Sequence, residues 1–218
     1  MGRYAEARNL AQDTLDRRRR VLGEDHRDTL RSAHHLAASL RDLGDAQAAR
    51  ALDQDTLERR RRAFGEDDRE TLFSANNLAA ILRTLGEVQA ARDLTQDTLD
   101  RKRRVLGEDH PSTLISADTL ALNLRALGEV QAARDLDQST LDRRRRILGE
   151  DHPDTLRSAT NLAADLRDMG EGQEARDLDR DTLERRRRVL GEDHPDTLRS
   201  ATNLAADLRA LGQSGDGL

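Results

Sequence analysis

Histidine and carboxylate side chains meet in a short segment that recurs along the chain. Its first copy is Leu22-Gly-Glu-Asp-His26, and an imidazole beside two carboxylates has the residue types of a metal site or an acid–base pair. The copies are 42 residues apart, so on helical elements they fall on separate loops, about 10 Å or more apart, too far to share one ion. The second copy has Asp68 instead of histidine. The pattern favours loop structure and helix capping, with metal binding or catalysis as the alternative.

No other arrangement in the sequence indicates catalysis. The only lysine, Lys102, stands within a run of arginines, so no Walker P-loop is present, and cysteine is absent. The sequence also lacks a G-x-S-x-G elbow, an H-E-x-x-H pair and an EF-hand loop. We therefore predict a non-enzymatic protein with no catalytic residue, no cofactor and no metal.

Runs of basic residues are the most prominent polar feature of the sequence. Four consecutive residues on a helix point around its whole circumference, so one run cannot form a single basic face. Each run follows an acidic residue and precedes a Glu-Asp pair, which favours a solvated, salt-bridged outer surface over a nucleic-acid site. The runs are 17–20, 59–62, 101–104, 143–146 and 185–188.

The overall composition limits the partners and the location that we expect. A net charge of −5 predicts no strong electrostatic attraction to nucleic acid or to an anionic membrane. No apolar run approaches the roughly 20 residues that span a bilayer, and the N-terminus has no apolar signal region. We predict a cytoplasmic protein whose partners include neither nucleic acid nor membrane.

Two helical patterns fill each 42-residue period. In the second period the first pattern runs from Glu70 to Leu85 with apolar residues three or four apart, and the second runs from Glu87 to Leu106. A glycine follows each pattern, as expected for a helix that ends in a left-handed turn. Short connections make such helices antiparallel, and neither helix buries its apolar stripe alone, so pairs must stack. We predict one array over residues 1–212, with an unpaired helix 3–22, helix pairs 28–64, 70–106, 112–148 and 154–190, an unpaired helix 196–211, and a disordered tail 213–218.

The repeated sequence resembles a known family. The pattern Leu-Gly-Glu-Asp-His-Pro-Asp-Thr-Leu-x-Ser-Ala-x-Asn-Leu-Ala-x-x-Leu, clearest at 148–166 and 190–208, is similar to the 42-residue tetratricopeptide repeats of kinesin light chains and their bacterial relatives. The resemblance implies an all-α, right-handed superhelical solenoid whose first helices line a concave groove for partner proteins. In bacteria such arrays often follow the nucleotide-binding module of signal-transducing NTPases, which implies the sensor part of a larger signalling protein.

The second helix of each repeat departs from the family pattern at two positions. The first, usually a large apolar residue, reads Ala11, Asp53, Thr95, Asp137 and Asp179. The second, also usually apolar, reads Arg17, Arg59, Arg101, Arg143 and Arg185. Either these side chains pair with one another between stacked repeats, or this face is more open than usual. Pairing is favoured because an unpaired buried charge is very costly.

Positions that vary between the copies of the repeat indicate the recognition surface. Phe73, Ile115 and Leu122 break the repeat in its middle copies and predict an apolar patch in the groove. An invariant arginine ladder of Arg41, Arg83, Arg125, Arg167 and Arg209 runs along the same wall, and the resemblance implies that asparagines there hold peptide main chain. The alternatives are packing between repeats for Phe73 and Ile115, and for the arginines salt bridges to the neighbouring Asp42, Asp165, Asp168 or Asp207. The predicted partner-binding residues are Phe73, Asn76, Asn77, Arg83, Ile115, Leu122, Arg125, Asn161 and Arg167.

These residues predict a protein or peptide partner that is acidic and carries an apolar anchor. The alternative function is self-assembly, because helices 3–22 and 196–211 are complementary halves of one repeat and could dock head to tail. A further interpretation of the two unpaired helices is that the sequence belongs to a longer array.

Overall fold

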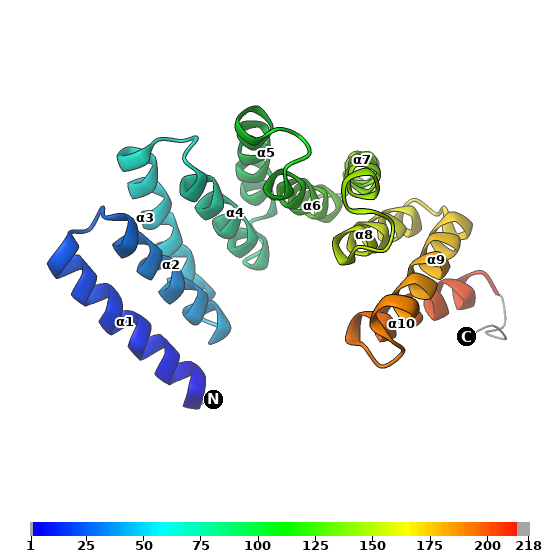
Figure 1. Cartoon of the computed structure of the whole chain (residues 1–218), viewed down its shortest axis with the longest axis horizontal. Helices are drawn as coiled ribbons and strands as arrows, with labels where there is room; N and C mark the ends of the chain where they lie inside the picture. The colour runs from blue at the N-terminus through cyan, green and yellow to red at the C-terminus, as the bar shows by residue number, and fades with distance from the viewer. Residues whose placement is uncertain (1, 213–218) are drawn as a thin grey trace. The chain divides into compact units, whose positions relative to one another are not determined.

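The structure, a computed structural model, describes residues 2–212 and contains only helices there (Figure 1). The all-α class predicted from the sequence is therefore confirmed, while the tail 213–218 lies outside the described residues. The helices are α1 (Gly2–Leu22), α2 (Arg27–Asp42), α3 (Ala46–Phe64), α4 (Arg69–Thr84), α5 (Val88–Leu106), α6 (Pro111–Ala126), α7 (Val130–Leu148), α8 (Pro153–Asp168), α9 (Gly172–Leu190) and α10 (Pro195–Ala210).

The helices form two compact units, each described by itself. The N-terminal unit is Met1–Glu108 and holds α1 to α5, and the C-terminal unit is Asp109–Leu218 and holds α6 to α10. Within each unit, every helix packs on the next one in the chain. We call α2, α4, α6, α8 and α10 the first helices of the repeat, and α1, α3, α5, α7 and α9 the second helices.

The histidine and carboxylate segments cap the first helices. The Nδ1 atom of His26 accepts a hydrogen bond from the backbone N–H of Asp28 at 3.2 Å. In the copy without histidine, the carboxylate of Asp68 accepts from the backbone N–H of Glu70 at 3.0 Å and of Thr71 at 3.3 Å. Histidine and aspartate thus satisfy the same free N–H groups at the start of a helix.

Glycine ends the second helices with a backbone conformation that other residues avoid. The residue after α5, Gly107, has φ 87°, and its N–H donates to the backbone carbonyl of Arg103. Because a left-handed φ is cheap only for glycine, this residue stops the helix and turns the chain toward the capping segment.

Alanine allows the two helices of a pair to approach closely. Ala37 of α2 and Ala49 of α3 are fully buried in one cluster, and Ala79 of α4 and Ala91 of α5 are fully buried in another. In the C-terminal unit, Ala175 of α9 lies in the cluster of Leu141, Leu162 and Leu166. A core with few aromatic side chains is filled by small residues at short distances between helices.

The second residue of each basic run turns into the protein, which corrects the prediction that the runs form only a solvated surface. Arg60, Arg144 and Arg186 are each 2% exposed. Arg144 donates two hydrogen bonds to the Asp118 carboxylate, at 2.9 and 2.8 Å, and a third to Ser158 Oγ on the next first helix. Arg60 likewise donates to Ser74 Oγ at 2.7 Å and to the Glu70 carbonyl at 2.8 Å.

In the third run the same position holds Lys102, which is also 2% exposed. Burial lowers the pKa of Lys102 to about 8, because the charged ammonium loses its hydration.

The first residue of each run behaves as the predicted salt-bridged surface. In four of the five runs it pairs with the aspartate of the Glu-Asp loop that precedes the adjacent first helix, and we call this contact the outer ion pair. In the first run, Arg17 pairs with Asp13 of its own helix. Arg143 and Asp109, for example, are 2.7 Å apart, and Arg146 of the same run reaches Asp109 at 3.0 Å. The outer ion pairs are Arg59–Asp25, Arg101–Asp67, Arg143–Asp109 and Arg185–Asp151.

These contacts correct one sequence interpretation. The aspartate and arginine positions that depart from the family pattern do not pair with each other in the contacts that the described residues make. Arg59 binds Asp25 and Asp55, whereas Asp53 faces Nδ1 of His34 at 3.5 Å.

The buried arginine gives the first prediction. Replacing Arg144 with alanine leaves Asp118 buried without its main partner, so we expect the free energy of unfolding to fall by about 3–5 kcal/mol. Its neighbour Arg145 contacts only surface carboxylates, and Arg145→Ala should cost less than about 1 kcal/mol. Urea unfolding followed by circular dichroism measures both variants. Equal losses for the two would contradict the assigned burial of Arg144.

Candidate partner-binding surface

Helix α4 exposes one stripe of side chains between buried neighbours. Phe73, Asn76, Asn77, Ala80 and Arg83 are exposed or partly exposed, and we call them the α4 stripe. Their spacing of three or four residues places them on one face of the helix. The residues on the opposite face are buried against α3 and α5, so packing of the pair fixes the direction of the stripe.

Phe73 is both a packing residue and an exposed one. Its ring meets the ring of His34 on α2 edge to face, with centroids 5.3 Å apart, so the packing alternative holds in part. Half of Phe73 is still exposed, at 50%. The pKa of the neighbouring His35 is lowered mainly by burial. The charges of His34, Arg31 and Arg18 lower it further. An aromatic surface thus continues from α2 onto α4.

The polar members of the α4 stripe differ in their surroundings. Arg83 is exposed and forms no ion pair with another described residue. The side-chain nitrogen of Asn77 is covered and has no hydrogen-bond partner among residues 2–212, which leaves one amide donor unused. Asn76 is partly exposed one residue earlier. The stripe therefore combines a free cation, amide groups and an aromatic ring.

Helix α6 carries the corresponding stripe in the C-terminal unit. Ile115 is 49% exposed and lines a cavity of about 210 Å³ together with Ile147 and Leu148 of α7. Leu122, two turns further along α6, is half-buried. Phe73 belongs to the other unit, so a single apolar patch that joins it to Ile115 and Leu122 stays a prediction.

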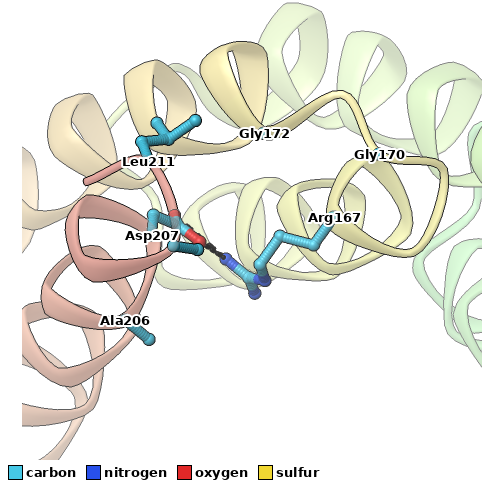
Figure 2. A pocket seen from close by; sticks show the side chains of 7 residues that line it. Arg167, Gly170, Gly172, Ala206, Asp207 and Leu211 are labelled. Carbon is cyan, nitrogen blue, oxygen red and sulfur yellow. Dashed lines mark hydrogen bonds and ion pairs between the residues drawn. The ribbon is translucent and has the colours of Figure 1, made fainter. Parts of the chain in front are cut away.

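The arginine ladder is not uniform. In the C-terminal unit the salt-bridge alternative applies to Arg125 and Arg167, whereas Arg209 is exposed and forms no ion pair with a described residue. Arg125 lies 3.5 Å from the Asp165 carboxylate, and Arg167 of α8 lies 2.6 Å from Asp179 and 3.1 Å from Asp207. Arg167 also lines a cavity of about 420 Å³ with Gly172 and Leu211, and Figure 2 shows its guanidinium directed at Asp207. Asn161 is partly exposed on the same face of α8.

Buried carboxylates lie beside the ladder. Burial, and then the nearby Asp165 carboxylate, raises the pKa of Asp137 to about 9, so this side chain holds a proton at neutral pH. Burial also raises the pKa of Asp179, but only to about 6, because Arg167 opposes the effect. The sequence predicted that both aspartates pair with arginines such as Arg143 and Arg185 of the second helices, whereas Asp179 pairs with Arg167 of a first helix.

Two further properties of the described residues bear on function. No group of three or more histidine, cysteine or acidic side chains within residues 2–212 is placed to hold a metal ion. In the same range, every helix is too short or too polar to cross a membrane.

Helix pairs that share one repeated core and expose variable stripes define a helical-repeat scaffold. Residues 1–62, 28–104, 70–145 and 118–171 match a family profile described as Tetratricopeptide repeat, and residues 155–196 match a second profile with the same description. The chain belongs to the tetratricopeptide repeat family. No curated protein matches the sequence.

Solved structures give the same result. Repeats described as nearly identical and TPR-like, from a kinesin light chain of Podosopora anserina, are 27% identical, with a TM-score of 0.78 over 86% of this chain and 88% of that one. BtubC (BKLC) from P. vanneervenii is 18% identical, with a TM-score of 0.81 over 96% and 84%. Rap protein complexed with Competence and Sporulation Factor is 11% identical, with a TM-score of 0.68 over 84% and 49%. The last two likenesses concern the fold alone.

The protonated Asp137 predicts that stability depends on pH. Its pKa is raised from 3.8 to about 9, so the folded state keeps a proton that the unfolded state releases. The resulting stability is complete below pH 4 and is lost as pH rises toward 9. In Asp137→Asn this dependence disappears, and we expect Tm at pH 8 to rise by a few degrees, about 2–4 °C.

Asp179→Asn is the matched control, because it removes the carboxylate that pairs with Arg167 and should lower Tm at pH 8. Thermal unfolding at pH 5 and pH 8 compares both variants with the unchanged protein. A fall in Tm for Asp137→Asn at pH 8 would mean that Asp137 is ionised in the folded state.

Proposed function

We propose that this protein is a non-enzymatic interaction scaffold and that the α4 stripe is its primary contact surface for a partner peptide or domain. The observation that carries the proposal is the exposed pair of Phe73 and Arg83 on one face of α4. Phe73 is half exposed, and on the same face Arg83 is an exposed guanidinium that forms no ion pair with another described residue.

The chemistry of the stripe suits an acidic segment with an apolar anchor. An apolar side chain of the partner would cover Phe73, and a carboxylate would form a two-pronged contact with Arg83. Arg41 of α2, at the equivalent ladder position in the same unit, is also exposed and forms no ion pair with a described residue. Asn76 and Asn77 lie between the ring and the guanidinium, where amide groups would bind peptide main chain.

The C-terminal unit offers a second, weaker set of contacts. Ile115 and Leu122 supply apolar area, and Asn161 supplies an amide. Arg125 and Arg167 already bind aspartates, so a partner carboxylate would have to compete with an existing ion pair. We expect these two arginines to contribute less to binding than Arg83.

The fold neighbours are compatible with this function. Rap was captured with Competence and Sporulation Factor, which places a bound partner on a protein of similar fold. In line with the family resemblance, we propose that the scaffold is the ligand-binding part of a larger signalling protein located in the cytoplasm.

The third prediction tests the α4 stripe with a defined probe. Labelled peptides of alternating Asp and Glu around one central Leu or Phe should bind the unchanged protein, and peptides with Lys in place of the acids should not. The double variant Phe73→Ala/Arg83→Ala should weaken binding by about tenfold or more while far-UV circular dichroism stays unchanged. Fluorescence anisotropy measures both.

Helix α5 offers a matched control in the same unit. Val105 is 47% exposed, and Arg103 has a side chain that is 39% exposed, so Val105→Ala/Arg103→Ala removes the same kinds of group from another surface. The control should bind the acidic peptide normally. If the two double variants bind the acidic peptide equally well, the α4 stripe is not the contact surface.

A further inference from the structure

Helix α10 exposes an apolar face that the other first helices bury. Leu198 is 55% exposed, whereas its equivalents Leu156 and Leu114 are 2% and 4% exposed. Ala205 is partly exposed, whereas its equivalent Ala163 is fully buried. In α8 this face is covered by α9, the second helix of the same pair. Within residues 2–212 no second helix covers it on α10, so α10 presents one half of a helix pair.

Helix α1 presents the other half. Its Ala7 is exposed, whereas the equivalent Ala49 and Ala91 are fully buried against first helices. Leu10 is 68% exposed, and with Ala7 it lines a cavity of about 460 Å³ on α1 and α2. In complete pairs this alanine packs on the alanine of the first helix, and α1 lacks that neighbour among the described residues.

The charges at the two surfaces are complementary. Arg17 of α1 has a side chain that is 71% exposed and pairs only with Asp13 of its own helix, whereas its equivalent Arg59, in an outer ion pair, is 24% exposed. Arg20 forms no ion pair with a described residue. In the loop before α10, Glu192 and Asp193 are likewise exposed and form none. Each surface thus holds one half of an outer ion pair.

We infer that a second copy of this chain docks head to tail, with α10 of one copy packed on α1 of the next. The 42-residue spacing sets the register, because α1 then takes the place of the second helix that would pair with α10. Ala205 meets Ala7, and Asp193 of one copy pairs with Arg17 and Arg20 of the other, as in the four outer ion pairs within the chain. A contact between two different surfaces leaves further surfaces free and produces chains or closed rings.

Charge reversal at either surface tests this inference. Arg17→Glu/Arg20→Glu puts acid against acid, and Glu192→Arg/Asp193→Arg puts base against base, so each variant alone should associate more weakly by a factor of more than about ten. Mixed in equal amounts, the two variants are complementary at both contacts, and association should return. Sedimentation velocity over a concentration series measures the unchanged protein, each variant and the mixture.

The control reverses two other exposed arginines of the N-terminal unit, Arg62→Glu and Arg69→Glu, and should associate like the unchanged protein. Circular dichroism checks that every variant is folded. Association by the unchanged protein and by the mixture, but by neither variant alone, supports the head-to-tail contact. A monomeric unchanged protein at every concentration, or a mixture that stays monomeric, overturns it.

Discussion

The buried basic residue of each run is the interaction on which the rest of the structure depends. A guanidinium removed from water is costly unless its N–H groups find acceptors, and burial lowers the pKa of Arg60 and Arg186 for that reason. Arg186 offsets this cost by donating hydrogen bonds to the Ser200 hydroxyl and to the backbone carbonyls of Asp196 and Leu156. Because these acceptors lie on two successive first helices, the residue holds the second helix at a fixed place between them. A core of leucine and alanine alone would leave this spacing less well defined.

That fixed spacing determines which residues are buried in contacts between helices and which remain exposed. In every first helix, packing leaves one face that does not contact the adjacent helices. The residues on that face differ between the copies of the repeat. In the C-terminal unit the buried Asp165, Asp179 and Asp207 draw Arg125 and Arg167 into ion pairs. In the N-terminal unit, Ile81 stands 40 residues after Arg41, where Asp165 stands 40 residues after Arg125. Thr95 stands 12 residues after Arg83, where Asp179 stands 12 residues after Arg167, and both Arg41 and Arg83 remain exposed. One invariant arginine position thus forms buried ion pairs at Arg125 and Arg167 and stays exposed at Arg41, Arg83 and Arg209.

The sequence predicted those features that arise within one helix or one turn. Capping by His26 and Asp68, the helix ends at glycine and the alternation of helices depend on residues a few positions apart, and repetition made them unmistakable. The exposed stripe also followed from helical spacing, so the nine candidate residues fall on exposed or partly exposed positions. Of the pairings across helices, the salt-bridge alternative for the ladder named Asp165 and Asp207, which Arg125 and Arg167 contact, but the buried pairings of the basic runs did not follow. Whether Arg144 faces solvent or Asp118, 26 residues away, depends on how far apart the stacked helices lie, and no periodicity encodes that distance.

Accessibility of the arginines measures this account most directly. Brief treatment of the native protein with an arginine-modifying reagent, followed by peptide mass spectrometry, reports which guanidinium groups reach solvent. We expect Arg60, Arg144 and Arg186 to be protected, and Arg83 and the third residue of each run to be labelled rapidly. Equal labelling of the second and third residues would contradict it, because the helices would then lack the buried contact that sets their spacing.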